Sequence, residues 1–272
     1  MAKACSCCLA IAFALLTCAT AAFGSGFTHS DNFIVFAPDQ ETASEILKKA
    51  EQYRRILAIQ WFGEELSSSS RRTLTSVIMD GKTTHAEFWA MDGDDGKHYK
   101  LDLVNFREET LDAALAHEIS HMIMELRFDG ELPIWTDEGL ATFQSHRSKR
   151  VGHASLMKAI AETREWPALK ALLATDRIDK YDRTSYAVAT SLTSYLLRQG
   201  DAQTLFDFAL SGRRIDWNHA SQEHYAMSLA QLEQSWRTWV TRMASQGPLL
   251  TIVTPPRMAA AKRNYSTRNM GD

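Results

Sequence analysis

The chain has 272 residues, of which 45% are hydrophobic and 23% charged, a balance typical of a globular protein with a full core. The formal net charge is −3, so the chain as a whole lacks the excess of positive charge with which nucleic-acid-binding proteins hold phosphate groups. We therefore expect no nucleic-acid partner.

Residues 1–25 have the pattern of a secretory signal peptide. Lys3 supplies a positive start, residues 9–16 (LAIAFALL) form an apolar run, and residues 19–21 (ATA) offer small side chains for cleavage. The apolar run is short for a membrane-spanning helix. We predict a secreted or periplasmic protein without stable membrane insertion after cleavage. Lipidation of Cys18 is less well supported, because Thr17 is an unusual residue before a lipidated cysteine.

The four cysteines all lie within this segment. The mature chain is therefore expected to contain no disulfide and no cysteine metal site. A domain without disulfides in an oxidising compartment must be held by its core, with the help of any metal that it binds.

The pattern of residues 26–245 predicts one α+β domain. Its first part is a small mixed sheet with one packing helix (residues 30–108), and its second part is mainly helical (residues 109–245). Apolar and β-branched runs indicate strands, and the breaker-rich segment 92–96 (DGDDG) indicates a hairpin turn between the last two of them. Apolar residues at helical spacing indicate the packing helix. The expected strands are 32–37, 73–79, 85–91 and 98–104, and the expected helix is 42–61.

The helical pattern begins near Thr110, a candidate cap, and continues to about residue 243. A break at residues 130–133 precedes a second helix, for which Thr136 is the candidate cap. Residues 246–272 are rich in Gly, Pro and basic residues and are predicted to be a disordered tail. The later expected helices are 154–163, 167–174, 183–198, 202–210 and 228–243.

The first helix of this part carries the sequence HEISH, residues 117–121. A spacing of four residues puts His117 and His121 on one helix face, one turn apart, where both can bind one cation. Glu118 lies about 100° further round the helix. It is displaced from the metal but close enough to take a proton from a water that the metal activates. A five-residue motif also arises by chance, so a third ligand is needed to support the site.

Glu138 is the candidate third ligand, because two histidines and a glutamate form a known catalytic zinc set with water in the fourth position. It lies 17 residues after His121, in the first turn of the predicted second helix. An acidic residue there also suits the positive end of the helix dipole. Asp137 can fill that simpler role, so we assign the dipole to Asp137 and the metal to Glu138.

HEISH followed by residues 133–141 (PIWTDEGLA) resembles the gluzincin metallopeptidases, the clan that includes aminopeptidase N and thermolysin. Within this clan, the chain is most similar to exported proteins with a compact peptidase MA-like domain. The resemblance is specific only around these two motifs. It implies a zincin-like fold, one Zn²⁺ per chain, a peptide or protein substrate, and Glu138 as the ligand. The gap between His121 and Glu138 is somewhat shorter than in the aminopeptidases, which leaves the connecting loop undefined.

The resemblance implies two further features. Residues 185–189 (SYAVA) are similar to the helix of aminopeptidase-like members whose tyrosine stabilises the oxyanion, and the matching residue is Tyr186. Tyr181 and Tyr195 are rival candidates. The alternative for Tyr186 is an ordinary core tyrosine on an amphipathic helix. In the same clan, an edge strand before the metal helix holds the substrate by backbone pairing, and residues 85–91 are the counterpart in this chain. The resemblance thus implies Phe88, Trp89 and Ala90 as substrate-binding residues. That run also fits an ordinary amphipathic strand.

The segment with which exopeptidases of the clan anchor a free amino terminus is missing from the sequence, so aminopeptidase activity is not supported. Histidines outside the motif have no ligand spacing to it, and we interpret them as surface or capping residues. These are His146, His153, His219 and His224.

The sequence therefore predicts an exported zinc metallopeptidase in which His117, His121 and Glu138 bind the metal and Glu118 is the general base. The alternative is a catalytically inactive binding or scaffold protein of the cell envelope that keeps the zincin fold. Retention of Glu118 argues against this alternative, because a protein without catalysis has no need of the base.

Overall fold

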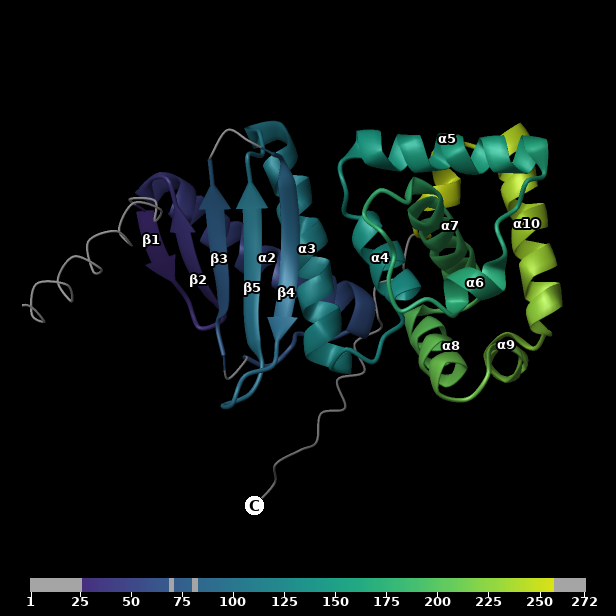
Figure 1. Cartoon of the computed structure of the whole chain (residues 1–272), viewed down its shortest axis with the longest axis horizontal. Helices are drawn as coiled ribbons and strands as arrows, with labels where there is room; N and C mark the ends of the chain where they lie inside the picture. Colours follow the sequence, from purple (N-terminus) through teal and green to yellow (C-terminus); the bar gives the residue numbers. More distant parts are fainter. Residues whose placement is uncertain (1–25, 69–70, 80–82, 257–272) are drawn as a thin grey trace, which may run out of the picture.

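The computed structural model describes residues 26–68, 71–79 and 83–256, except for the side chains of residues 108 and 109. The fold is α+β, as predicted, with a five-stranded mixed sheet and its helices on one side and a mainly helical part on the other (Figure 1). Helix α3 lies between the two parts. The predicted signal peptide falls outside the described residues. Within them, no helix has the length and apolar character needed to cross a bilayer.

The sheet has the strand order β1-β2-β3-β5-β4. Strands β2, β3 and β5 are parallel, whereas β1 and β4 pair antiparallel at the two edges. Alternate residues of the parallel strands point to one face and are fully or nearly buried there, as the period of two requires. The strands are β1 (Gly26–His29), β2 (Phe33–Ala37), β3 (Thr73–Ile78), β4 (His85–Met91) and β5 (His98–Val104).

Two long helices cover the buried face of the sheet. Helix α2 (Gln40–Phe62) packs against β1 and β2, and α3 (Glu108–Phe128) packs against β4, β5 and α2. The carboxylate of Asp39 caps the start of α2, and Gly63 ends it in the left-handed conformation, with φ of 76°. The two helices and the sheet share one apolar core, which buries the inner edge of α3.

The helical part wraps around α7, whose middle residues are buried on all sides. Helix α4 packs closely against α7, and α5 and α10 also contact α7 (Figure 1). Its elements are α4 (Ile134–Thr142), α5 (Arg147–Thr163), α6 (Leu169–Leu173), α7 (Arg183–Gln199), α8 (Ala202–Arg214), α9 (Trp217–Tyr225), α10 (Leu229–Gln246) and the 3₁₀ helix η1 (Leu249–Val253).

The predicted boundaries differ from the structure at both caps proposed for the metal helices. Helix α3 begins at Glu108, before Thr110, and α4 begins at Ile134 after Pro133. Thr136 is therefore an internal residue of α4, and it is fully buried. Pro133 is the N-cap residue, and its carbonyl accepts from the backbone N–H groups of Thr136 and Asp137.

The prediction of disorder from residue 246 onward is wrong for residues 246–256. Helix α10 continues to Gln246, and η1 then packs against α5, α7 and α10. Ile252 and Val253 are fully buried, and the Ser194 hydroxyl of α7 donates to the backbone carbonyls of Thr251 and Thr254. The composition of residues 246–256 predicts a disordered tail, but burial of two apolar side chains in the core holds this segment in place. Residues 257–272 lie outside the described residues.

Candidate metal centre

The two histidines of the HEISH motif lie on the face of α3 that looks toward the helical part. Their rings approach edge to face, and the distance between the two Nε2 atoms is 3.4 Å. Neighbouring Leu115, Ile119 and Met122 of α3 are buried in the shared core and fix the rotation of the helix. The predicted spacing has therefore placed both imidazoles where they can bind one ion.

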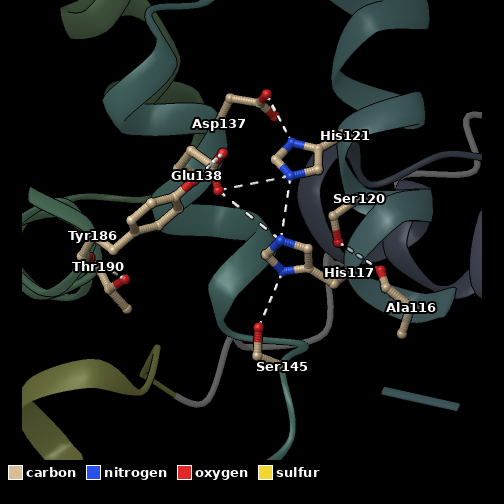
Figure 2. A network of polar contacts seen from close by, with 9 residues as sticks. All are labelled: Ala116, His117, Ser120, His121, Asp137, Glu138, Ser145, Tyr186 and Thr190. Carbon is tan, nitrogen blue, oxygen red and sulfur yellow. Dashed lines mark hydrogen bonds and ion pairs between the residues drawn. The ribbon is translucent and has the colours of Figure 1, made fainter. Parts of the chain in front are cut away.

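Glu138 comes from α4 and points between the two rings (Figure 2). Its Oε2 atom lies 3.9 Å from Nε2 of His117 and 3.7 Å from Nε2 of His121. The position of α4 depends on Trp135, which is fully buried, and on Gly139, where an added Cβ would clash with the Thr193 side chain of α7. The structure thus brings together the three residues that the sequence identified as metal ligands.

Outer hydrogen bonds orient both imidazoles. Nδ1 of His121 lies 2.8 Å from a carboxylate oxygen of Asp137, and Nδ1 of His117 lies 3.1 Å from the Ser145 hydroxyl. A carboxylate only accepts, so it requires the proton of His121 to be on Nδ1, which leaves Nε2 free to bind a metal. Asp137 therefore stands in the first turn of α4, as predicted, and in addition it positions a candidate metal ligand.

The three inward atoms fit a metal ion. In a tetrahedral zinc site with bonds of about 2.0–2.1 Å, neighbouring ligand atoms lie about 3.4 Å apart, close to the distances of 3.4, 3.7 and 3.9 Å found here. Oε2 of Glu138 is buried and has no hydrogen-bond donor. Buried acceptors that converge without a donor are costly unless a cation lies among them. The donor set of two nitrogens and one carboxylate oxygen is typical of zinc.

The charge balance of the cluster also favours one added positive charge. Burial and the positive charges of Lys149 and His121 hold the pKa of His117 well below its usual range, so His117 keeps its lone pair. Burial alone would lower the pKa of His121, but Asp137 and Glu138 outweigh it and raise that pKa to about 10. The cluster thus attracts a proton to His121, and a metal would have to displace that proton to bind.

Glu118 lies beside this cluster and is 5% exposed. Burial raises the pKa of its carboxyl to about 7, and the negative charge of Glu138 adds to the effect. The backbone N–H of Phe88, on the edge strand β4, opposes the shift. A carboxylate with a pKa near neutrality can both accept and return a proton, which is the property of a general acid–base group.

Tyr186 is the one of the three candidate tyrosines that reaches the cluster. Its hydroxyl donates to Oε1 of Glu138 at 3.3 Å (Figure 2). Burial, followed by the charge of Glu138, raises the pKa of its phenol well above the usual range, so the phenol keeps its proton. Tyr181 is 79% exposed, and Tyr195 is buried against Trp239. The phenol of Tyr186 is thus a hydrogen-bond donor at the metal cluster.

His153 is a residue at the site that the sequence did not identify. It was interpreted as a surface or capping histidine, but it is 4% exposed and its ring stacks on Tyr186 with centroids 6.4 Å apart. Burial lowers its pKa to about 4, and Lys149 and Arg183 reinforce this effect. Its position four residues after Lys149 on α5 was visible in the sequence, but the burial of that helix face was not. Of the other histidines, His146 caps α5, in agreement with its interpretation.

A cleft of about 1860 Å³ contains the cluster, Glu118, Tyr186 and His153. Strand β4 forms one side of the cleft, and within the described residues it pairs with β5 alone, so it is an edge strand of the sheet there. Of the predicted substrate-binding residues, Phe88 and Ala90 line the cleft. Trp89 does not, because alternation along the strand points its ring to the opposite face, where Lys100 lies over it.

No protein-family model, curated protein or solved structure matches the chain. The resemblance to gluzincins therefore extends no further than the two short motifs, and the function has to be inferred from the chemistry of the site.

Proposed function

We propose that the protein is a zinc-dependent metallopeptidase that hydrolyses peptide bonds. The observation that carries the proposal is the convergence of three oriented ligand atoms, from His117, His121 and Glu138, beside a buried carboxylate with a raised pKa, Glu118. A structural metal site has no use for such a carboxylate, whereas hydrolysis needs a base next to the metal.

Zinc, when bound, would lower the pKa of a water molecule and polarise the substrate carbonyl. Glu118 would take a proton from that water as it attacks and then deliver the proton to the leaving amine. Burial of Glu118 beside the cluster keeps its proton affinity high enough for the second step. Asp137 and Ser145 hold the two imidazoles so that their lone pairs stay turned to the metal.

Tyr186 would act on the carbonyl oxygen. The phenol keeps its proton and points at Glu138, so a short rotation brings its O–H to an oxyanion that develops beside the cluster. The outer edge of β4 would hold the peptide in an extended form through backbone hydrogen bonds, with Phe88 and Ala90 beneath it.

Digestion of a peptide library tests the proposal. The purified protein should cleave peptides, a chelator should abolish cleavage, and added Zn²⁺ should restore it. The substitution Glu118→Gln removes the base without changing the size of the side chain, and we expect kcat to fall by about 10²–10⁴-fold while about one equivalent of zinc is retained. Zinc binding with no cleavage by the unaltered protein would instead favour the inactive scaffold.

We also propose that the protein acts outside the cytoplasm, on the basis of the signal-peptide pattern in residues 1–25. Cell fractionation would find the full chain processed in the periplasm or the medium. A variant without residues 1–25 should stay in the cytoplasm, and equal export of both forms would contradict the proposal.

A further inference from the structure

Basic residues occupy the first turns of the two helices that face the metal centre across the cleft. Helix α5 begins with residues 147–150 (RSKR), and α7 begins with Arg183. Neither helix has an acidic residue in its first turn. The amino end of a helix carries partial positive charge, so cations at this position destabilise the helix and anions stabilise it. The stability of α5 and α7 therefore does not explain why Lys149 and Arg183 are there.

Both cations line the cleft, Lys149 from the first turn of α5 and Arg183 from the first turn of α7. Nζ of Lys149 is 5.5 Å from the centroid of the Tyr186 ring. The guanidinium of Arg183 lies against Gly152 of α5, where an added Cβ would be 3.3 Å from Nη2. Lys149 precedes His153 by one turn of α5, and Arg183 precedes Tyr186 by one turn of α7. The two cations thus lie beside Tyr186 and His153, the two aromatic side chains next to the metal centre.

Among the described residues, no ion pair joins Lys149 or Arg183 to a carboxylate, and Lys149 acts on Glu118 and Glu138 only through longer-range electrostatics. Asp176 and Asp179 line the same cleft, and Asp179 accepts from the backbone N–H of Tyr181. By contrast, Lys97 on the sheet side is paired with Glu125 and Asp129. The unpaired positive charges are therefore at the α5–α7 end of the cleft.

We propose that Lys149 and Arg183 bind a carboxylate of the substrate, so that the cleft selects peptides with a negative charge close to the scissile bond. This inference rests on the proposed peptidase function. An extended residue spans about 3.5 Å, so a carboxylate at Lys149 lies one or two residues from the carbonyl that Tyr186 reaches. The carboxylate is either the carboxyl terminus of the peptide or the side chain of Asp or Glu.

Four matched peptides separate these two sources. They share a cleaved sequence from the library and carry Glu or Gln two residues beyond the scissile bond, each with a free or an amidated carboxyl terminus. We expect a carboxylate to raise kcat/KM by about 10- to 100-fold over its neutral counterpart, as a charge-assisted hydrogen bond allows. Preference for the free terminus identifies a terminal carboxylate, and preference for Glu over Gln identifies a side chain. Equal rates for all four peptides would overturn the inference.

Substitution of the cations tests their assignment. Lys149→Gln and Arg183→Gln should each remove most of the preference, mainly through KM, and Lys149→Glu should turn it toward peptides with Lys at the same position. Both residues are exposed, so folding should not change. Zinc content is measured in parallel, because the charge of Lys149 also acts on His117 and Glu138. Lys158→Gln is the matched control, because Lys158 lies on the same helix but is paired with Glu162. A preference that survives in the double variant of Lys149 and Arg183 would contradict the assignment.

Binding to the Glu118→Gln protein separates failure of this inference from failure of the proposed function. The four peptides, labelled with a fluorophore, are titrated and followed by anisotropy, which needs no cleavage. Cleavage by the unaltered protein without discrimination among the peptides would leave the peptidase standing and refute the carboxylate site. Selective binding of the acidic peptides without any cleavage would refute the peptidase and leave the carboxylate site standing.

Discussion

The two sides of the cleft are built in opposite ways. On the α3–α4 side, the polar groups are buried, and each imidazole is tied to a second residue, His121 to Asp137 and His117 to Ser145. On the α5–α7 side, Lys149 and Arg183 are exposed and unpaired at the rim, with Tyr186 further in. Buried polar groups are held in one geometry and compete little with water for their hydrogen bonds. Exposed charged side chains act at longer range and can change conformation to meet a ligand.

This difference implies a division of roles. Changes on the α3–α4 side should alter metal binding, and changes on the α5–α7 side should alter the reaction or substrate preference while the metal stays bound. Glu118 is the exception on its side, because it belongs to α3 but would act on the water and the substrate in the proposed reaction.

Removal of a ligand should have the largest effect. Glu138→Ala leaves two histidines for the metal, and we expect zinc content to fall from about one equivalent to a small fraction, with loss of all cleavage. Metal analysis after dialysis measures this. Retention of full zinc by the variant would show that Glu138 is not a ligand.

Tyr186→Phe should lower kcat by about 10²-fold, the scale of one oxyanion donor, while KM and zinc content change little. The phenol donates to Glu138 in the absence of substrate, but it is not needed to hold the metal. Steady-state kinetics with metal analysis in parallel gives the answer. A fall in zinc content as large as the fall in kcat would mean that Tyr186 belongs functionally with the α3–α4 side.

Glu118 should make the metal-free protein less stable as pH rises. Its folded pKa is raised from 4.5 to about 7 by burial, so the folded state binds more protons than the unfolded state in this window. The stability contributed by protonated Glu118 is present below pH 4.5 and is lost toward pH 7, by about 3 kcal/mol. Chemical denaturation of chelated protein at several pH values should show that Glu118→Gln flattens this part of the profile. An unchanged slope would contradict the raised pKa.

Asp137→Asn should weaken zinc binding by about 10- to 100-fold, because the carboxylate no longer fixes the Nδ1 proton of His121. Ser145→Ala removes a neutral partner of His117 and should have a smaller effect. Competition with a chromogenic chelator yields both affinities. A larger loss for Ser145→Ala than for Asp137→Asn would show that charge is not what distinguishes the two partners.

Gly139→Ala should destabilise the fold by about 1–3 kcal/mol, because the new methyl group would clash with Thr193 where α4 meets α7. Zinc affinity should fall with it, since Glu138 is the preceding residue. Gly152→Ala on α5 is the control: its methyl meets only the end of the Arg183 side chain, and alanine favours the helix by up to about 1 kcal/mol. Equal effects of the two substitutions in a thermal melt would sink this account.

Local sequence patterns were enough to predict the metal helix and much of the fold. HEISH sets two imidazoles one turn apart in any helix, because the spacing of four residues nearly matches the helical period. The alternating runs of β4 and β5 and the helical periods of α2 and α7 also depend on local pattern, and the predicted ranges agree with the structure. Helix α9 and strand β1 were missed, because one is polar over most of its length and the other has four residues.

Which polar residues meet depends instead on contacts between segments that are far apart in the chain. Asp137 and Glu138 are neighbours in one turn, and it is the packing of α4 on α7 that sends one carboxylate to the outer nitrogen of His121 and the other to the metal position. The choice of Tyr186 over Tyr181 and Tyr195, the burial of His153 and the fixed segment at η1 likewise depend on contacts between elements far apart in the chain. Local pattern sets which face a side chain occupies, but only packing sets what that face meets.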